Sequence, residues 1–203
     1  MKKVMKNVMA VAMMMLVSAS AFAQYDWMKS SLTFGYTNES FSSLLGKEVV
    51  ATYPNTFGLG GQFNEAFEIF DFAGRVVSVG LDTSVDLNYS QFDHAGTTHM
   101  GEFSIQVGPA VSFRPTDKLC FRAYAKIAPT IVGQHMPDID KGYAGLGLMT
   151  TIGATACFGR FGLGVEQRGG GVTLMEIRDS KLNKDASKDI SFVGPRFFLV
   201  LGL

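Results

Sequence analysis

The sequence predicts an all-β protein, an eight-stranded antiparallel up-and-down transmembrane β-barrel. The segment 76–89 alternates large apolar residues with Ser, Gly, Asp and Asn without a break. Strands of soluble proteins usually have about five or six residues, whereas a tilted bilayer crossing needs about ten. After residue 23 no long unbroken apolar segment follows. A membrane form of this chain therefore has to be a closed barrel, which satisfies the backbone polar groups between strands.

Seven further segments show the same alternation of large apolar residues with Gly, Ser, Thr or charged residues. They are residues 31–38, 56–63, 103–114, 119–131, 143–158, 161–168 and 193–203. With the first segment they make eight strands, the size of the smallest natural membrane barrels.

The connections between these strands alternate in length, as expected for a barrel with both termini on the inner side of the membrane. Long polar outer loops are predicted at residues 39–55, 90–101, 132–142 and 169–189. Tight inner turns are predicted at residues 115–117 and 159–160. The inner connection 64–75 is too long for a tight turn. It either forms a short amphipathic helix at the inner interface or is shortened by strands that extend into it.

Aromatic residues fall at both ends of the predicted strands, as in the two interfacial girdles of a membrane barrel. The outer set is Tyr89, Phe103 and Tyr143, and the inner set is Phe113, Phe121, Phe158 and Phe161. The distance from Phe103 to Phe113 along a tilted strand is roughly 25 Å, the height of the apolar band. A periplasmic lipocalin-like ligand-binding barrel is the alternative, but it would line its cavity with large apolar residues.

The N-terminus predicts export. Three lysines precede a short apolar run over residues 8–17, and Ala21-Phe22-Ala23 supplies small residues at a cleavage site. We expect residues 1–23 to be a signal peptide and residues 24–203 to be the barrel. Formal net charge is 0 at pH 7, so the sequence suggests no nucleic-acid surface.

The arrangement over residues 24–203 resembles the small outer-membrane β-barrel proteins of the OmpA-like and OmpX-like kind, particularly the porin-family barrels of Bacteroidetes. The signal peptide, the glycine-rich segment 142–148 and the closing segment 194–203 carry the resemblance most clearly. It implies a monomer in outer-membrane lipid whose last strand is recognised by the barrel assembly machinery. The final residue of that family is usually aromatic, and Leu203 departs from this. We expect no peptidoglycan-binding domain after Leu203.

Strand parity places nine charged residues on the inward face, with signs that nearly cancel. They are Asp82, Asp86, Glu102 and Glu166 against Arg114, Arg122, Lys126, Arg168 and Arg196. An eight-stranded barrel is just wide enough for side chains to fill it, and buried charges are tolerated when paired. The sequence therefore predicts a salt-bridged lumen in a structural or weakly conducting, porin-like barrel.

Two other functions compete with this interpretation. An enzyme or metal site could use His94, His99 and His135 with Asp93, Asp138 and Asp140, if the outer loops converged. No recognisable catalytic motif accompanies them, so we expect no enzyme, cofactor or metal. An adhesin or partner-binding barrel could use apolar residues of the first and fourth outer loops, unless these extend the strands. The residues are Leu44, Val49, Val50, Tyr53, Leu174, Met175 and Ile177.

The only two cysteines form a candidate disulfide. If strands 119–131 and 143–158 pair symmetrically about a centre between Asp138 and Ile139, Cys120 faces Cys157 on the inward side. Exported proteins meet an oxidising compartment, which favours a bridge. The alternative is a pair of small apolar residues that do not bond.

Overall fold

The computed structural model describes residues 29–45, 48–74, 76–93, 96–178 and 181–203. The predicted signal peptide over residues 1–23, as well as His94, lies outside the described residues. Within the described ranges no helix is long and apolar enough to cross a membrane.

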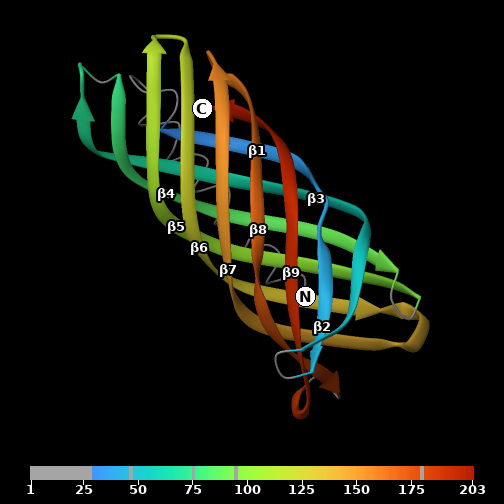
Figure 1. Ribbon diagram of the computed structural model, residues 1–203. Coiled ribbons are helices and arrows are strands. Elements are labelled where there is room, and N and C mark those ends of the chain that lie inside the picture. The colour runs from blue at the N-terminus through green and yellow to red at the C-terminus, as the bar shows by residue number, and fades with distance from the viewer. Residues whose placement is uncertain (1–28, 46–47, 75, 94–95, 179–180) are drawn as a thin grey trace.

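The described chain is almost entirely β-strand, and every strand pairs antiparallel with its neighbours in the sheet. The strands are β1 (Ser30–Thr37), β2 (Ser40–Leu45), β3 (Glu48–Phe72), β4 (Val77–Asp93), β5 (Thr97–Thr116), β6 (Leu119–Met136), β7 (Lys141–Phe158), β8 (Phe161–Arg178) and β9 (Lys181–Gly202), with a short 3-10 turn η1 (Pro137–Ile139) between β6 and β7. Both β1 and β2 pair with β3 on one side and with β9 on the other, so together they fill one position. The ring therefore has eight strand positions, as the sequence predicts, and Figure 1 shows its tilted strands.

The strand register sets the width of the barrel. Starting at Thr33 and moving from each residue to its register partner on the next strand, one circuit of the barrel ends at Ser43. Ser43 occupies the same strand position as Thr33, so the stagger of the barrel is ten residues (43 minus 33). Strand number and this stagger together fix the tilt and diameter of a barrel. With eight positions, the interior is only wide enough for side chains to fill it.

The outward face is apolar at every strand position. One side chain from each, all more than half exposed, illustrates this: Phe34, Leu59, Leu87, Ile105, Ile127, Ile152, Leu163 and Leu199. In water such a surface would be strongly unfavourable, whereas the outer face of a transmembrane barrel carries an apolar band. The middle of the interior instead holds buried charged and hydroxyl side chains, so a lipocalin-like cavity lined throughout by apolar residues does not fit.

Both termini of the barrel lie at the same end, which we call the terminal end. There the N–H of Leu203 donates to the carbonyl of Ser30 over 3.0 Å. Exposed aromatic residues gather at this end, as predicted for the inner girdle: Phe113, Phe121, Phe158 and Phe161, joined by Phe67 and Phe70. At the opposite end, which we call the loop end, the rings of Phe57 and Tyr89 lie 6.5 Å apart on the outer face.

The connection 64–75 forms no amphipathic helix. Strand β3 continues to Phe72, with a bulge between Glu68 and Phe70, and the chain reverses at Ala73 and Gly74. Both residues have positive φ, 50° and 66°, and the N–H of Val76 donates to the carbonyl of Ala73 over 3.4 Å, so a short turn joins Phe72 to its register partner Val77. The alternative of extended strands is therefore the correct one for this connection.

The predicted outer loops are also mostly strand. Strands β3 to β9 run well beyond the segments predicted for them, and only short connections remain at the loop end. The apolar residues of these predicted loops alternate in the same way as those of the strands that they continue. Strand extension therefore explains why the predicted loops contain apolar residues. Tyr143, predicted in the outer girdle, instead points into the lumen and packs against buried apolar residues there.

Candidate functional site: the filled lumen

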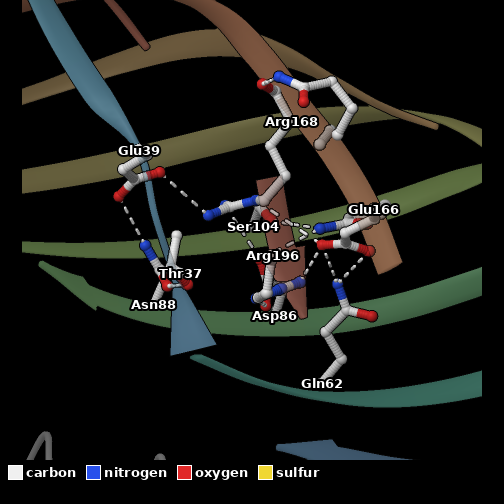
Figure 2. Close-up of polar contacts among 12 residues, drawn as sticks. Thr37, Glu39, Gln62, Asp86, Asn88, Ser104, Glu166, Arg168 and Arg196 are labelled. Atoms are coloured by element: carbon white, nitrogen blue, oxygen red, sulfur yellow. Dashed lines mark hydrogen bonds and ion pairs between the residues drawn. The ribbon is translucent and has the colours of Figure 1, made fainter. Parts of the chain in front are cut away.

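Two buried arginines from neighbouring strands occupy the middle of the lumen. Arg168 on β8 reaches Asp86 at 3.1 Å and Glu102 at 2.9 Å through Nη2. Arg196 on β9 reaches the same Asp86 at 2.7 Å through Nη1, and it also pairs with Glu166. Figure 2 shows Arg168 and Arg196 beside Asp86 and Glu166. Asp86 therefore links both arginines in one network.

Neutral side chains complete the coordination of these carboxylates. The hydroxyl of Tyr124 donates to Glu166 over 2.8 Å, and the amide of Gln62 donates to the same carboxylate over 3.2 Å. Carboxylates and arginines have more hydrogen-bonding capacity than a single ion pair uses. These additional donors reduce the free-energy cost of burying Glu166.

A second group of charges lies nearer the terminal end. Asp82 on β4 accepts from the Lys126 ammonium over 2.9 Å and lies 3.5 Å from Arg122. The ammonium of Lys126 also donates to Asn64 over 3.3 Å and to Ser84 over 3.1 Å. It lies 4.2 Å from the centre of the Tyr124 ring, which connects the two groups. Each of these charges is thus paired locally with a charge of opposite sign.

Two further charged residues, Glu39 and Glu68, lie in the lumen although the sequence did not predict them there. Glu39, assigned from the sequence to the first outer loop, is buried and lies 3.5 Å from Arg168, and it accepts from Asn88 over 2.9 Å. Glu68, assigned to the inner connection, pairs with Arg114 at the terminal end of the lumen. Each falls on the inward parity of its strand position. Extending the alternation two residues past Thr37, and six past Gln62, would have found both.

Pairing determines whether these charges stabilise the fold. The side chains of Arg196 and Glu166 are at most 1% exposed. Moving two charges out of water costs several kcal/mol each, and their attraction offsets this only when geometry and further hydrogen bonds are good. Removing one partner of such a pair leaves an uncompensated buried charge. The network therefore depends on all of its members.

The loop end of the lumen is apolar, whereas the sequence predicted a salt-bridged lumen. Ten buried side chains form one cluster there, which we call the loop-end cluster: Phe41, Phe92, Met100, Ala128, Val132, Met149, Val172, Leu174, Ile190 and Phe192. Phe41 packs edge-on against Phe92 with ring centres 4.8 Å apart. Phe92, Val132 and Leu174 are 0% exposed, so solvent does not reach this level of the described lumen.

A small pocket opens on the terminal-end side of the lumen. Its empty volume, including the part open to solvent, is about 290 Å³, and Asp82, Arg122 and Tyr124 are among its lining residues. Above it lie the Arg196 network and then the loop-end cluster. The pocket is therefore a blind recess of the barrel and not the mouth of a channel through the described residues.

The two cysteines face each other across β6 and β7. Cys120 pairs in register with Cys157, and Tyr124 with Gly153, where an added Cβ would lie 2.6 Å from the Tyr124 ring. Both thiols are free and buried in this structure, in a second apolar cluster with Phe198 and Val200. The bridge itself stays a prediction.

The described outer histidines and aspartates are His99, His135, Asp93, Asp138 and Asp140. His99 and His135 face each other on the outside of the barrel, while Asp138 accepts from the Thr97 N–H over 2.8 Å. Among the described residues, no group of three or more His, Cys, Asp and Glu side chains could hold a metal ion. The described histidines and aspartates therefore do not form the multi-residue metal cluster considered for the outer loops.

No protein-family model and no curated protein sequence matches the chain. Among solved structures, Neisserial surface protein A is similar over 86% of this chain and 97% of its own, with a TM-score of 0.52 and 13% sequence identity. The outer membrane protease OmpT from Escherichia coli covers 86% of this chain and 96% of its own, at 6% identity and a TM-score of 0.47. The outer membrane enzyme PagL covers 85% and 99%, at 11% identity and a TM-score of 0.42.

The first of these likenesses shows the fold. At 13% identity, it relates this chain to a small outer-membrane β-barrel in architecture and not in function. The expected resemblance to small outer-membrane barrels is therefore confirmed at the level of fold. The other two fall below a TM-score of 0.5 and carry no argument.

Proposed function

We propose that the protein is a closed outer-membrane barrel, a structural component of the cell envelope that presents its loop end on the cell surface and does not conduct. The observation that carries this proposal is the filled lumen. Charged networks around Asp86 and Asp82 occupy its middle, and the loop-end cluster lies above them without access to solvent. This supports a closed barrel over the weakly conducting form that the sequence left open.

Export and assembly follow from the two ends of the chain. Residues 1–23 direct the chain across the inner membrane and are removed, and the barrel assembly machinery recognises β9. Both barrel termini lie beside the short turns at the terminal end, which supports placing that end in the periplasm. The barrel functions as a monomer in outer-membrane lipid, without a cofactor, catalytic site or nucleic-acid partner.

Cell fractionation and gel mobility test this proposal. A closed barrel resists SDS until it is heated, so the unheated protein should migrate faster than the boiled protein. We expect this heat-dependent band in the outer-membrane fraction. Recovery of the mature protein only in the soluble periplasmic fraction would rule out the proposed location.

Partner binding through the loop end is a second candidate function. Val49 and Val50 on β3 are 60% and 65% exposed, and Ile177 on β8 is also exposed. These positions lie beyond the aromatic residues Phe57 and Tyr89, outside the apolar band. Aggregation of cells that express the protein, compared with cells that express Val49→Ser/Val50→Ser, tests this role. Equal aggregation would remove the support that these two valines give it.

A further inference from the structure

Two histidines lie opposite each other on the outer face of the barrel, near the loop end. His99 on β5 and His135 on β6 are paired in register, with His135 exposed and His99 half-buried. Directly opposed residues on antiparallel strands have Cβ atoms about 4.5 to 5.5 Å apart. Two imidazole rings at that separation can turn one nitrogen each toward a common point above the sheet.

Tyr89 on the neighbouring strand β4 already orients one of the two rings. Its hydroxyl lies 2.6 Å from Nδ1 of His99, and the two rings stack with centres 6.1 Å apart. This bond occupies Nδ1 and leaves Nε2 of His99 unengaged by Tyr89. Metal-binding histidines characteristically use one ring nitrogen for the metal and the other for a hydrogen bond that fixes the ring.

Open space lies immediately below the histidines. Gly101 and Gly133 are the next outward-facing residues on the same two strands, and they too are paired in register. A Cβ added at either position would meet nothing within 4 Å. Tyr89, the register partner of Gly101, borders this gap on one side, and Ala144, the partner of Gly133, borders it on the other. Water molecules that complete a coordination sphere have room here.

The surrounding charge favours a cation over an anion. Asp93 ends β4, and Asp138 and Asp140 follow β6 close to the histidines in sequence. The Asp138 carboxylate is anchored to the backbone of Thr97, the next outward residue above His99 on β5. Lys141, the nearest described lysine in sequence, is itself paired with Glu176 at 3.4 Å. An anionic ligand would meet these carboxylates, whereas a divalent cation would be attracted by them.

We propose that His99 and His135 bind a divalent transition-metal ion such as Zn²⁺ on the outer surface of the barrel, with water in the remaining coordination positions. Imidazole nitrogen suits zinc, copper and nickel, and not calcium or magnesium, which prefer oxygen ligands. When Nε2 of His99 binds the metal, its Nδ1–H donates to the Tyr89 oxygen. With only two protein ligands, the site is open and the ion is exchangeable, unlike a closed structural zinc site.

Calorimetric titration of the folded, tag-free protein in detergent micelles with Zn²⁺ tests this site. We expect one ion per barrel, and at least about tenfold weaker binding in each of His99→Ala and His135→Ala, since each removes one of two ligands. Tyr89→Phe should weaken binding about tenfold through the loss of the orienting bond. Thr150→Ala, at an exposed outward residue of β7 paired with Ile127, is the control and should bind like the unaltered protein. Heat-dependent gel mobility of every variant verifies that the barrel is folded.

Three results would overturn the proposal. The first is the absence of Zn²⁺ binding at millimolar concentration in the folded protein. The second is binding that both single histidine variants retain unchanged. The third is equal binding of Ca²⁺ and Zn²⁺, which would assign the ion to the neighbouring aspartates and not to imidazole.

Discussion

The middle of the lumen and its loop end are both filled, but with opposite chemistry. In the middle, Arg168 and Arg196 hold Asp86 between them in a network of buried ion pairs. At the loop end, Phe92 and Leu174 belong to an apolar cluster that excludes solvent. Both regions are built from the same inward parity of the same strands. The difference lies only in which side chains stand at successive inward positions.

This difference determines how each region fails. An ion-pair network is cooperative, because the removal of one charge leaves its partner buried and unpaired in a medium of low dielectric constant. An apolar cluster loses contacts in proportion to the volume removed, and no charge is left behind. Two successive levels of the lumen are therefore closed. The middle is closed by paired charges, and the loop end is closed by packed apolar side chains.

The largest effect should follow from Arg196→Met. It leaves Glu166 and Asp86 without one of their cations, and we expect a loss of about 3 to 5 kcal/mol in the free energy of unfolding. A urea titration followed by gel mobility measures this loss. Because Glu166→Gln removes the stranded charge, the double variant should recover part of the stability. A double variant that is less stable than Arg196→Met alone would contradict a paired network.

Truncation in the loop-end cluster should cost somewhat less and should not be rescued. Leu174→Ala removes a fully buried side chain, and we expect about 2 to 5 kcal/mol from lost contacts and the remaining cavity. Leu174→Met, which conserves volume, is the matched control and should cost less than about 1.5 kcal/mol. If the alanine variant were as stable as the control, the cluster would not be close-packed.

A smaller effect is expected for Tyr124→Phe. This change removes the hydroxyl that donates to Glu166 but leaves the ring over Gly153, and its cost should be about 1 to 3 kcal/mol. The same urea titration measures it. Arg196 and Gln62 still pair with Glu166 in this variant. A loss of stability as large as that of Arg196→Met would therefore show that the Tyr124 hydroxyl, and not the ion pair, contributes most to the stability of buried Glu166.

The smallest expected effect concerns a disulfide bond between Cys120 and Cys157, which is measured by mass spectrometry. If Cys120 and Cys157 are bridged, the unreduced mature protein from an oxidising envelope is lighter than the reduced protein by two hydrogen atoms. The register places them opposite each other on neighbouring strands. Free thiols at both positions in protein isolated without a reductant would refute the bridge and leave the barrel unaffected.

The sequence predicted the ring of eight strand positions and the inward set of charges because both follow from strict alternation along each strand. It failed where an element boundary was not chosen by parity. Glu39, between Asn38 and Ser40, and Glu68, between Phe67 and Ile69, were placed in connections, although both continue the inward parity of a strand. The spacing of Phe and Glu left a short amphipathic helix at residues 64–75 open beside extended strands, and β3 continues there.

The loop-end cluster was missed for a different physical reason. A lumen of Gly, Ser, Thr and charge was expected throughout, but Phe92 and Leu174 lie within predicted loops and Phe192 lies just before the predicted strand 193–203, where inward and outward faces were not assigned. Tyr143 was placed in the girdle because it is an aromatic residue at the end of the predicted strand 143–158, although it shares the parity of the inward residues Gly145 and Gly147. Only the register of the extended strands shows which of these side chains enter the barrel.

Single-channel recording in planar bilayers tests the central claim most directly, because it reports whether water and ions pass through the lumen. The filled lumen predicts no steady open channel for the unaltered protein. It predicts none for Arg196→Met either, since the loop-end cluster still closes that variant. A stable conductance of the unaltered protein, reproduced in preparations whose gel mobility shows a folded barrel, would contradict the closed lumen.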